Sequence, residues 1–250
     1  MSKIFGISYT SRHFNNRYKN ILKLGNECGL FNEFKCFTED DIDNDFKQKY
    51  KEVWNMSQRG GGYWIWKPYI ISKMLEKIND NDILIYIDSG CHINITKESK
   101  ERFNEYINMC NNSQSGLLRF QLKHQEKNFT NKKTINYFKN KFNISDTIMN
   151  DYLENFQLLS GIILFRKTEF SIKCINNWLD ILNDDAKLHT DIYTQNNEIH
   201  RHDQSIMSLL YKYMNGDLIL DDETWFGGHY GNFQSELSKN YPFWATRLRS

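Results

Sequence analysis

Apolar and polar residues in the first third of the chain follow two periods, one typical of strands and one typical of helices. Short apolar runs predict strands at three places: 3–10, 31–39 and 82–87. Apolar residues at helical spacing predict helices at three others: 15–30, 40–56 and 62–80. The resulting order, β-α-β-α-α-β, is typical of a parallel sheet with helices on both faces.

The regular alternation of strands and helices ends after residue 88. Helical spacing recurs in five segments: 97–112, 130–142, 145–156, 168–184 and 202–214. Strand-like apolar runs recur in three: 115–122, 156–166 and 217–220. The tail from residue 221 is rich in glycine and aromatic residues, which predicts irregular structure. No glycine- or serine-rich linker divides the chain. We therefore expect one α/β domain, 1–250, with a central, mainly parallel but mixed sheet flanked by helices.

Composition narrows the classes of function. Hydrophobic residues make up 40% of the chain and aromatic residues 15%, which is typical of a globular protein. A formal net charge of +1 gives no reason to expect a nucleic acid or a membrane surface as partner. The chain starts with too short an apolar run for a signal peptide and has no membrane-spanning apolar run, so we expect a cytoplasmic protein. The five cysteines form no C-x-x-C pair and are expected to be reduced and buried.

Asp88 directly follows the apolar strand 82–87. A carboxylate at the end of such a strand is costly to bury unless something pairs with it. In open α/β sheets, ligands bind outside the carboxyl ends of the strands. Ser89 and Gly90, which follow Asp88, are small enough to let a ligand approach closely. The position suits a divalent cation, Mn²⁺ or Mg²⁺, that carries a diphosphate, while the simpler alternative is a turn or helix-capping aspartate.

A glycine-rich stretch, "RGGGYWIWKPY" at 59–69, separates Arg59 from an aromatic cluster that contains Lys67. Glycine turns let backbone N–H groups face phosphates, and Arg59 and Lys67 add positive charge. The stretch lacks the spacing of a Walker A loop and of the dinucleotide-binding fingerprint. In the alternative interpretation, Trp64 and Trp66 are core anchors and the glycines form a plain loop.

A third polar cluster, "HRHDQ" at 200–204, precedes an apolar helical pattern. Aspartate is favoured at a helix N-terminus, so Asp203 could serve only as a cap. Five polar residues with two imidazoles are nevertheless more than a cap requires. We therefore treat His202, Asp203 and Gln204 as candidate functional residues, and we expect the helix end and Arg201 to keep Asp203 ionised.

Together these stretches resemble a nucleotide-sugar-dependent glycosyltransferase of the GT-A fold. More narrowly, the chain resembles a family found in bacterial surface-polysaccharide loci and in large DNA viruses, and the similar order and spacing cover about residues 3–223. Four motifs carry the resemblance: "YWIWKPYII" at 63–71, "DSGC" at 88–91, "SGIILFR" at 160–166 and "RHDQS" at 201–205. The resemblance implies a nucleotide-binding half at about 1–92 and an acceptor-binding half at about 93–250.

The GT-A resemblance implies a role for Asp88. The D-x-D motif of that fold ends a strand and binds Mn²⁺ or Mg²⁺ bridging the donor diphosphate, and Asp88 matches its first carboxylate. The third position is Gly90 rather than aspartate, which departs from the usual two-carboxylate site. Because some GT-A families use a histidine from the C-terminal segment, His229 is the candidate second metal ligand; the alternative is a surface loop residue.

Further site residues follow from the same resemblance. The donor would be a UDP- or GDP-linked sugar, and the acceptor a glycan or another hydroxyl compound in polysaccharide biosynthesis. The donor side is expected to comprise Ser8, Tyr9, Thr10, Arg59, Lys67, Asp88, Ser89 and Gly90. The acceptor side is expected to comprise Trp64, Trp66, Ser160, Gly161 and Gln204. Asp203, with His202 beside it, would be catalytic: a base in inverting enzymes, and a residue near the anomeric carbon in retaining ones.

Two other functions remain compatible with the sequence. A sugar nucleotidyltransferase would share a parallel sheet and metal-binding carboxylates, but it would need an N-terminal glycine-rich phosphate loop, which "GISYTSRHFNNR" at 6–17 lacks. A non-catalytic nucleotide- or sugar-binding relative is the other alternative, because Gly90 replaces the second carboxylate. In the tail, Arg247 and Arg249 could close over phosphates or lie in solvent.

Overall fold

The computed structural model describes residues 2–56, 59–226, 233 and 235–247. A central sheet of seven strands has the order β2-β1-β3-β7-β5-β6, with β8 paired beside β5. Its strands are β1 (Ile4–Tyr9), β2 (Glu33–Phe37), β3 (Ile83–Ile87), β5 (Leu117–Gln125), β6 (Phe156–Leu158), β7 (Ile162–Arg166) and β8 (Ile219–Asp221). Strands β1, β2, β3, β5 and β8 run in one direction, and β6 and β7 run in the other. The sheet is thus mixed and mostly parallel, which confirms the predicted α/β fold class.

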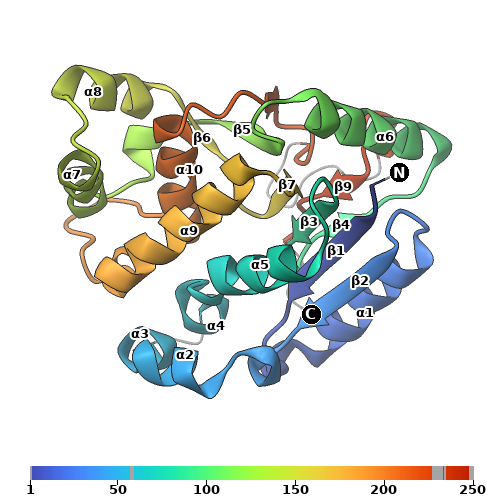
Figure 1. Cartoon of the computed structure of the whole chain (residues 1–250), viewed down its shortest axis with the longest axis horizontal. Helices are drawn as coiled ribbons and strands as arrows, with labels where there is room; N and C mark the ends of the chain where they lie inside the picture. Colours follow the sequence, from blue (N-terminus) through green and yellow to red (C-terminus); the bar gives the residue numbers. More distant parts are fainter. Residues whose placement is uncertain (1, 57–58, 227–232, 234, 248–250) are drawn as a thin grey trace.

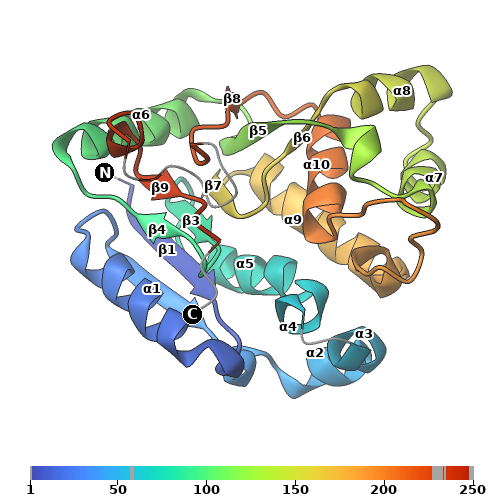
Figure 2. The same cartoon turned by 180° about the vertical axis from the view of Figure 1, so that it is seen from behind.

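Helices cover both faces of the sheet. The helices of the described chain are α1 (Asn15–Glu27), α2 (Asn44–Lys49), α3 (Lys51–Met56), α4 (Gly60–Tyr63), α5 (Trp66–Lys77), α6 (Lys97–Asn112), α7 (Lys132–Lys141), α8 (Asp146–Glu154), α9 (Glu169–Asp184) and α10 (Asp203–Tyr213). In Figure 1, α5 and α9 lie in front of the sheet, and in Figure 2, seen from behind, α1 lies in front of it. Within the described residues, no helix is long and apolar enough to cross a membrane.

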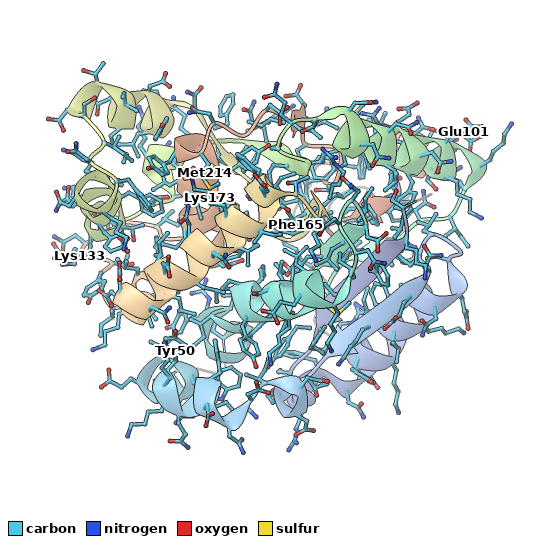
Figure 3. The ribbon with its side chains drawn as sticks, viewed as in Figure 1. Tyr50, Glu101, Lys133, Phe165, Lys173 and Met214 are labelled. Carbon is cyan, nitrogen blue, oxygen red and sulfur yellow. The ribbon has the colours of Figure 1, made fainter. Side chains whose placement is uncertain are left out.

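Each face of the sheet packs into its own hydrophobic core, because successive side chains along a strand point to opposite faces. In β3, Leu84 and Tyr86 pack with α5, α9 and α10, whereas Ile83, Ile85 and Ile87 pack with α1 and α6. All five side chains are fully buried. In Figure 3, Phe165 of β7 lies in the interior of the molecule, whereas Glu101 and Lys133 lie at its periphery. A strand buried on both faces explains why 82–87 contains an unbroken apolar run.

Three predicted elements differ from the observed ones. The predicted strand 156–166 is two strands, β6 and β7, and β7 runs antiparallel to β3. The predicted helix 40–56 is divided into α2 and α3 at Tyr50. The predicted helix 62–80 begins only at Trp66, because residues 60–64 all have positive φ angles. A right-handed helix does not contain such residues, so α4, at Gly60–Tyr63, is a left-handed turn that precedes α5.

A small second sheet brings the C-terminal segment to the end of β3. Strand β4 (His92–Ile93) pairs antiparallel with β9 (Phe243–Trp244). Just beyond β9, the Thr246 hydroxyl donates to the carbonyl oxygen of Gly90 at 2.6 Å. The tail, which was predicted to be irregular, is therefore anchored beside the turn that follows Asp88.

Candidate active site

A cavity of about 750 Å³ opens at the edge of the sheet where β1 and β3 end. Six stretches of chain contribute lining residues: 9–17, 59–67, 86–91, 159–161, 199–204 and 245–247. Because β7 runs antiparallel to β3, the start of β7 lies beside the end of β3. The Asp88 N–H accordingly donates to the Gly161 carbonyl oxygen at 2.7 Å. A cavity is thus present at the carboxyl end of β3, where the sequence predicted a ligand site.

The Lys67 ammonium group joins two carboxylates at this cavity. Its Nζ atom lies 2.5 Å from Asp203 Oδ2, 3.3 Å from Asp88 Oδ1 and 3.1 Å from the Ser160 carbonyl oxygen. The side chain is 1% exposed; its ammonium group donates to Asp203 and to the Ser160 carbonyl oxygen and forms an ion pair with Asp88. Burial alone would lower the pKa of Lys67, but Asp203 and Asp88 raise it above its ordinary value. We expected Lys67 to contact the donor; in the structure it pairs with the two carboxylates and also lines the cavity, and contact with a donor stays a prediction.

Asp88 lies immediately after β3 and begins a tight turn. The Cys91 N–H closes this turn by donating to the Asp88 carbonyl oxygen at 2.9 Å. In the side chain, Oδ1 accepts from the Tyr86 hydroxyl at 2.5 Å, while Oδ2 accepts no hydrogen bond from a described residue. Burial raises the pKa of the Asp88 carboxyl, as does the Asp203 charge, whereas Lys67 lowers it. A Cβ atom on Gly161 would lie 2.9 Å from Oδ2, so only glycine leaves room for this carboxylate.

Asp203 is the first residue of α10, but it does not cap the helix. The cap position belongs to His202, whose side chain makes no capping hydrogen bond. The Asp203 carboxylate, 8% exposed, accepts from Lys67 and from the Ser160 hydroxyl, which lies 2.7 Å away, both on Oδ2. Its Oδ1 atom accepts no hydrogen bond from the described chain, and Asp203 lines the cavity. The capping alternative is therefore wrong, and the carboxylate faces the site.

His202 is held in a strained and apolar position. Its φ angle is 51°, which places a non-glycine residue in the left-handed region. The ring stacks on Trp64 with centroids 5.4 Å apart and meets Tyr63 edge-on at 5.2 Å. Neither ring nitrogen has a hydrogen-bond partner among the described residues, although Nε2 lies 3.7 Å from Asp191 Oδ1. Burial lowers the pKa of His202, so the imidazole is neutral at neutral pH.

The glycine-rich turn places its aromatic residues against the cavity. The Trp66 ring stacks on Tyr9 at 3.7 Å, and its Nε1–H donates to the Gly60 carbonyl oxygen at 2.8 Å. Trp64 and Trp66 both line the cavity, and Trp66 is also part of the core. Arg59 reaches the cavity and pairs with Asp191 at 3.1 Å. The segment therefore combines the two alternatives that the sequence left open: Trp66 is a core residue, and Trp64, Trp66 and Arg59 also line the cavity.

The residues at the end of β1 divide between three locations. Tyr9 lines the cavity, with one ring face covered by Trp66. Ser8 is fully buried and does not line the cavity. Thr10 lines a neighbouring, smaller hollow of about 340 Å³. Of these three donor-side candidates, the structure brings Tyr9 alone into the main cavity.

Three of the remaining candidate residues, Ser89, Gly90 and Gln204, line the same cavity as Asp88 and Asp203, and the fourth, His229, cannot be placed. Ser89 and Gly90 line the cavity in the turn after β3. Gln204 also lines it, and its Nε2 group donates to Gln157 Oε1 at 2.6 Å. His229, the proposed second metal ligand, lies outside the described residues.

The cavity carries an excess of positive charge. Its charged lining residues are five cations, Arg17, Arg59, Lys67, Arg201 and Arg247, and two carboxylates, Asp88 and Asp203. Five positive and two negative charges leave a surplus of three, which favours an anionic ligand.

The described residues fit a divalent cation in one specific way. No group of three His, Cys, Asp or Glu side chains within them could enclose a metal ion. Asp88 Oδ2 is nonetheless an open carboxylate oxygen beside the cavity. Mg²⁺ and similar hard cations are often held by one or two carboxylates together with substrate phosphates and water. This mode, rather than a cage built by the protein, is the one that the described donor atoms allow.

Sequence reasoning missed Arg17, Tyr86 and Asp191. Arg17 shares one helix face with the buried Ile21 and Gly25, at spacings of four residues, and an arginine on an apolar face is a detectable signal. Tyr86 stands two residues before Asp88, so the period of a strand puts the two on one face. Asp191 lies in an irregular segment, and nothing in its sequence neighbourhood indicates a contact with Arg59.

Comparison with known proteins finds similarity in the fold but none in the sequence families searched. No protein-family model and no curated protein matches this sequence. A solved glycosyltransferase involved in the glycosylation of the major capsid of PBCV-1 has a TM-score of 0.51 at 12% identity, over 96% of this chain and 91% of that chain. This likeness bears out the GT-A resemblance at the level of the fold.

Two other solved structures are more distant. Mouse xyloside xylosyltransferase 1 has a TM-score of 0.42 at 13% identity, over 90% of this chain and 86% of that one. The bifunctional glycosyltransferase WbbM has a TM-score of 0.46 at 11% identity, over 90% of this chain and 40% of that one. Both likenesses are too weak to support an argument.

The Lys67 bridge makes a prediction about stability. Lys67→Met keeps much of the side-chain volume but leaves two neighbouring carboxylates unpaired. Breaking a buried ion pair in this way costs about 3–5 kcal/mol, and we expect the free energy of unfolding to fall by that order near pH 7. The loss should shrink as the pH falls toward about 4, because a carboxyl whose folded-state pKa is raised takes up a proton on folding.

Urea unfolding of wild type and Lys67→Met, near pH 7 and at about pH 4, measures this loss of unfolding free energy. Lys73→Met is the matched control. Lys73 lies on the same helix and pairs with Asp43 at 2.9 Å, but its side chain is 41% exposed. An exposed pair contributes about 0–1 kcal/mol, so the control should lose little. Equal losses in the two variants would show that the bridge does not stabilise the fold.

Proposed function

We propose that this chain is a glycosyltransferase that moves a sugar from a nucleoside-diphosphate sugar to a hydroxyl group of a glycan or another acceptor. One observation carries the proposal: the Lys67-bridged carboxylates Asp88 and Asp203 line a cationic cavity at the carboxyl ends of the strands. The glycosyltransferase-like fold supports the same conclusion. Similarity at this level shows the fold, so the donor and the chemistry are argued from the site.

The donor side is argued from charge and size. A nucleoside-diphosphate sugar brings two phosphates, which match the surplus of positive charge among the lining residues. A cavity of about 750 Å³ lies within the usual range for small-molecule sites. Arg59 and Tyr9 line it on the side of β1 and the glycine-rich turn, where we place the UDP- or GDP-linked donor.

We propose that Asp88 Oδ2 holds Mn²⁺ or Mg²⁺ together with the donor phosphates. The bound cation would stabilise the negative charge that develops on the leaving diphosphate. Gly161 and the 88–91 turn leave the space beside this oxygen. Tyr86 and Lys67 orient the carboxylate through its other oxygen, Oδ1.

The acceptor side is argued from Asp203. Lys67 and Ser160 hold one oxygen of this carboxylate and leave Oδ1 directed to no described residue. We assign to Oδ1 the acceptance of the proton from the acceptor hydroxyl as the glycosidic bond forms. His202, a neutral imidazole with two unpaired ring nitrogens, would position the acceptor through a hydrogen bond. The partly exposed Trp64 offers apolar contact to a sugar ring, whereas Trp66, which also lines the cavity, is buried against Tyr9.

A thermal-shift assay tests the proposal against its rivals. The wild-type protein is heated with each nucleoside diphosphate, with and without Mn²⁺, and separately with nucleoside triphosphates and sugar 1-phosphates. Stabilisation by one nucleoside diphosphate that increases with Mn²⁺ supports the transferase, because a ligand that binds only the folded state raises its stability. Stabilisation by a nucleoside triphosphate together with a sugar 1-phosphate would instead support a nucleotidyltransferase.

The proposed metal site predicts the behaviour of Asp88→Asn. The substitution keeps the shape of the side chain but removes the charge that attracts the cation. We expect the Mn²⁺-dependent part of nucleoside-diphosphate binding to disappear, while binding in EDTA stays equal or strengthens because the cavity loses a negative charge. Titration calorimetry with and without Mn²⁺ measures both, and Asp180→Asn on the exposed surface of α9 is the matched control. A metal response equal to that of wild type would exclude Asp88 as the ligand.

The proposed proton acceptor predicts the behaviour of Asp203→Asn. We expect the transfer rate to fall by about 10²–10⁴, which is the usual contribution of a general base, with donor affinity little changed. The melting temperature should also fall, because Lys67 loses its shortest ion pair. The rate is therefore measured below the melting temperature of the variant.

Ser160→Ala is the matched control for Asp203→Asn. It removes the 2.7 Å hydrogen bond to Asp203 but leaves the carboxylate in place. A single hydrogen bond contributes about 0.5–1.5 kcal/mol, so the rate should fall no more than about tenfold. A similar small loss in both variants would remove Asp203 from the chemistry and leave it a purely structural partner of Lys67.

A further inference from the structure

Arg17 occupies an unusual place for an arginine. It lies in the first turns of α1, on the face that also carries the buried Ile21 and Gly25. This face packs against the sheet, and Arg17 is 6% exposed. Its side chain lines the cavity together with the 88–91 turn and Arg247. A helix residue with an apolar neighbourhood therefore extends a cationic group into the candidate active site.

The Arg17 guanidinium has no protein partner that balances its charge. Its Nε and Nη1 atoms are buried and have no hydrogen-bond partner among the described residues, and no described carboxylate lies within ion-pair distance. Two other arginines differ because they have protein acceptors. The fully buried Arg119, whose Nε also lacks a partner, donates through Nη2 to the Leu159 carbonyl oxygen at 2.8 Å, and the half-buried Arg166 donates to that of Ser113 at 2.8 Å.

This arrangement is costly in the free protein. Arginine keeps its charge at neutral pH and presents N–H donors in a planar fork that matches phosphate geometry. A buried charge without a partner is strongly unfavourable, and each unmade hydrogen bond of a buried donor adds to that cost. A ligand that brings negative charge to the guanidinium would remove the cost.

We propose that Arg17 binds the diphosphate of the nucleotide-sugar donor directly, through paired N–H···O hydrogen bonds from its guanidinium. This inference rests on the proposed function and names a residue of the same site. The 88–91 turn, which lines the cavity with Arg17, contains one acidic residue, Asp88, followed by Ser89, Gly90 and Cys91. A diphosphate anchored near Asp88 therefore keeps negative charge that a guanidinium can neutralise, independently of any metal ion. In the reaction, the same contact stabilises the diphosphate as it leaves with the electron pair of the sugar–phosphate bond.

The test compares Arg17→Met with Lys19→Met. Both variants remove one positive charge from α1, but Lys19 lies on the exposed face of the helix and outside the cavity. The probes are inorganic pyrophosphate, UDP and GDP, each titrated by calorimetry into the full chain in the presence of EDTA. The melting temperature of each ligand-free variant is measured alongside.

We expect Arg17→Met to weaken the binding of pyrophosphate and of the preferred nucleoside diphosphate by about 10- to 100-fold, the effect of losing charge-assisted hydrogen bonds. Lys19→Met should bind both as wild type does. Without ligand, Arg17→Met should melt no lower than wild type, because the variant loses an unpaired buried charge. A purely structural arginine predicts the reverse pattern, with a lower melting temperature and unchanged affinities, and that result would overturn the proposal.

The probes also separate this inference from the proposed function. If UDP or GDP binds wild type and Arg17→Met equally well, the transferase proposal stands and the role of Arg17 is refuted. If pyrophosphate binding depends on Arg17 but neither nucleotide binds more tightly than pyrophosphate, the anion site stands and the nucleotide-sugar donor loses its support. If wild type binds neither pyrophosphate nor a nucleotide, the Arg17 site is refuted.

Discussion

The candidate site depends on the ion pairs that the Lys67 ammonium group forms with two carboxylates. This ammonium group is buried between Asp88, at the end of β3, and Asp203, at the start of α10. Without this shared cation the two carboxylates would repel each other, and Asp203, whose side chain is 8% exposed, would be a buried charge without an ionic partner. The left-handed turn at 60–64 determines where α5 begins and hence where Lys67 lies. Through one side chain, the first half of the chain thus positions a functional group of the second.

Local patterns in the sequence predicted most of the elements and the edge of the sheet that carries the site. Asp88, Asp203, Ser160 and Gly161 converge as expected because strand ends and helix starts have local signals. The bridging role of Lys67 was not predictable, because Asp203 lies 136 residues away in the chain. The antiparallel direction of β7, whose start follows Ser160, likewise has no signature in "SGIILFR" at 160–166. Contacts between distant segments, such as that of Arg59 with Asp191, likewise depend on packing that no local pattern encodes.

Charge organises the cavity into two parts. On the acceptor side, Lys67 and Ser160 occupy one oxygen of Asp203 and leave the other for a substrate hydroxyl. On the donor side, Asp88 offers an oxygen to a cation, and Arg17 offers unpaired N–H groups to an anion. A diphosphate that carries a divalent cation satisfies both at once. Gly161 is required for this arrangement, since a side chain there would collide with Asp88.

Activation of a nucleotide-linked sugar in the cavity can be measured without knowledge of the acceptor. The protein is incubated with a panel of UDP- and GDP-linked sugars in Mn²⁺, and the released nucleoside diphosphate is quantified. We expect slow, saturable release from one donor class, competed by the matching free nucleoside diphosphate. If the whole panel gives neither release nor competitive binding, the cavity does not activate a nucleotide-linked sugar, and the glycosyltransferase-like fold serves another function.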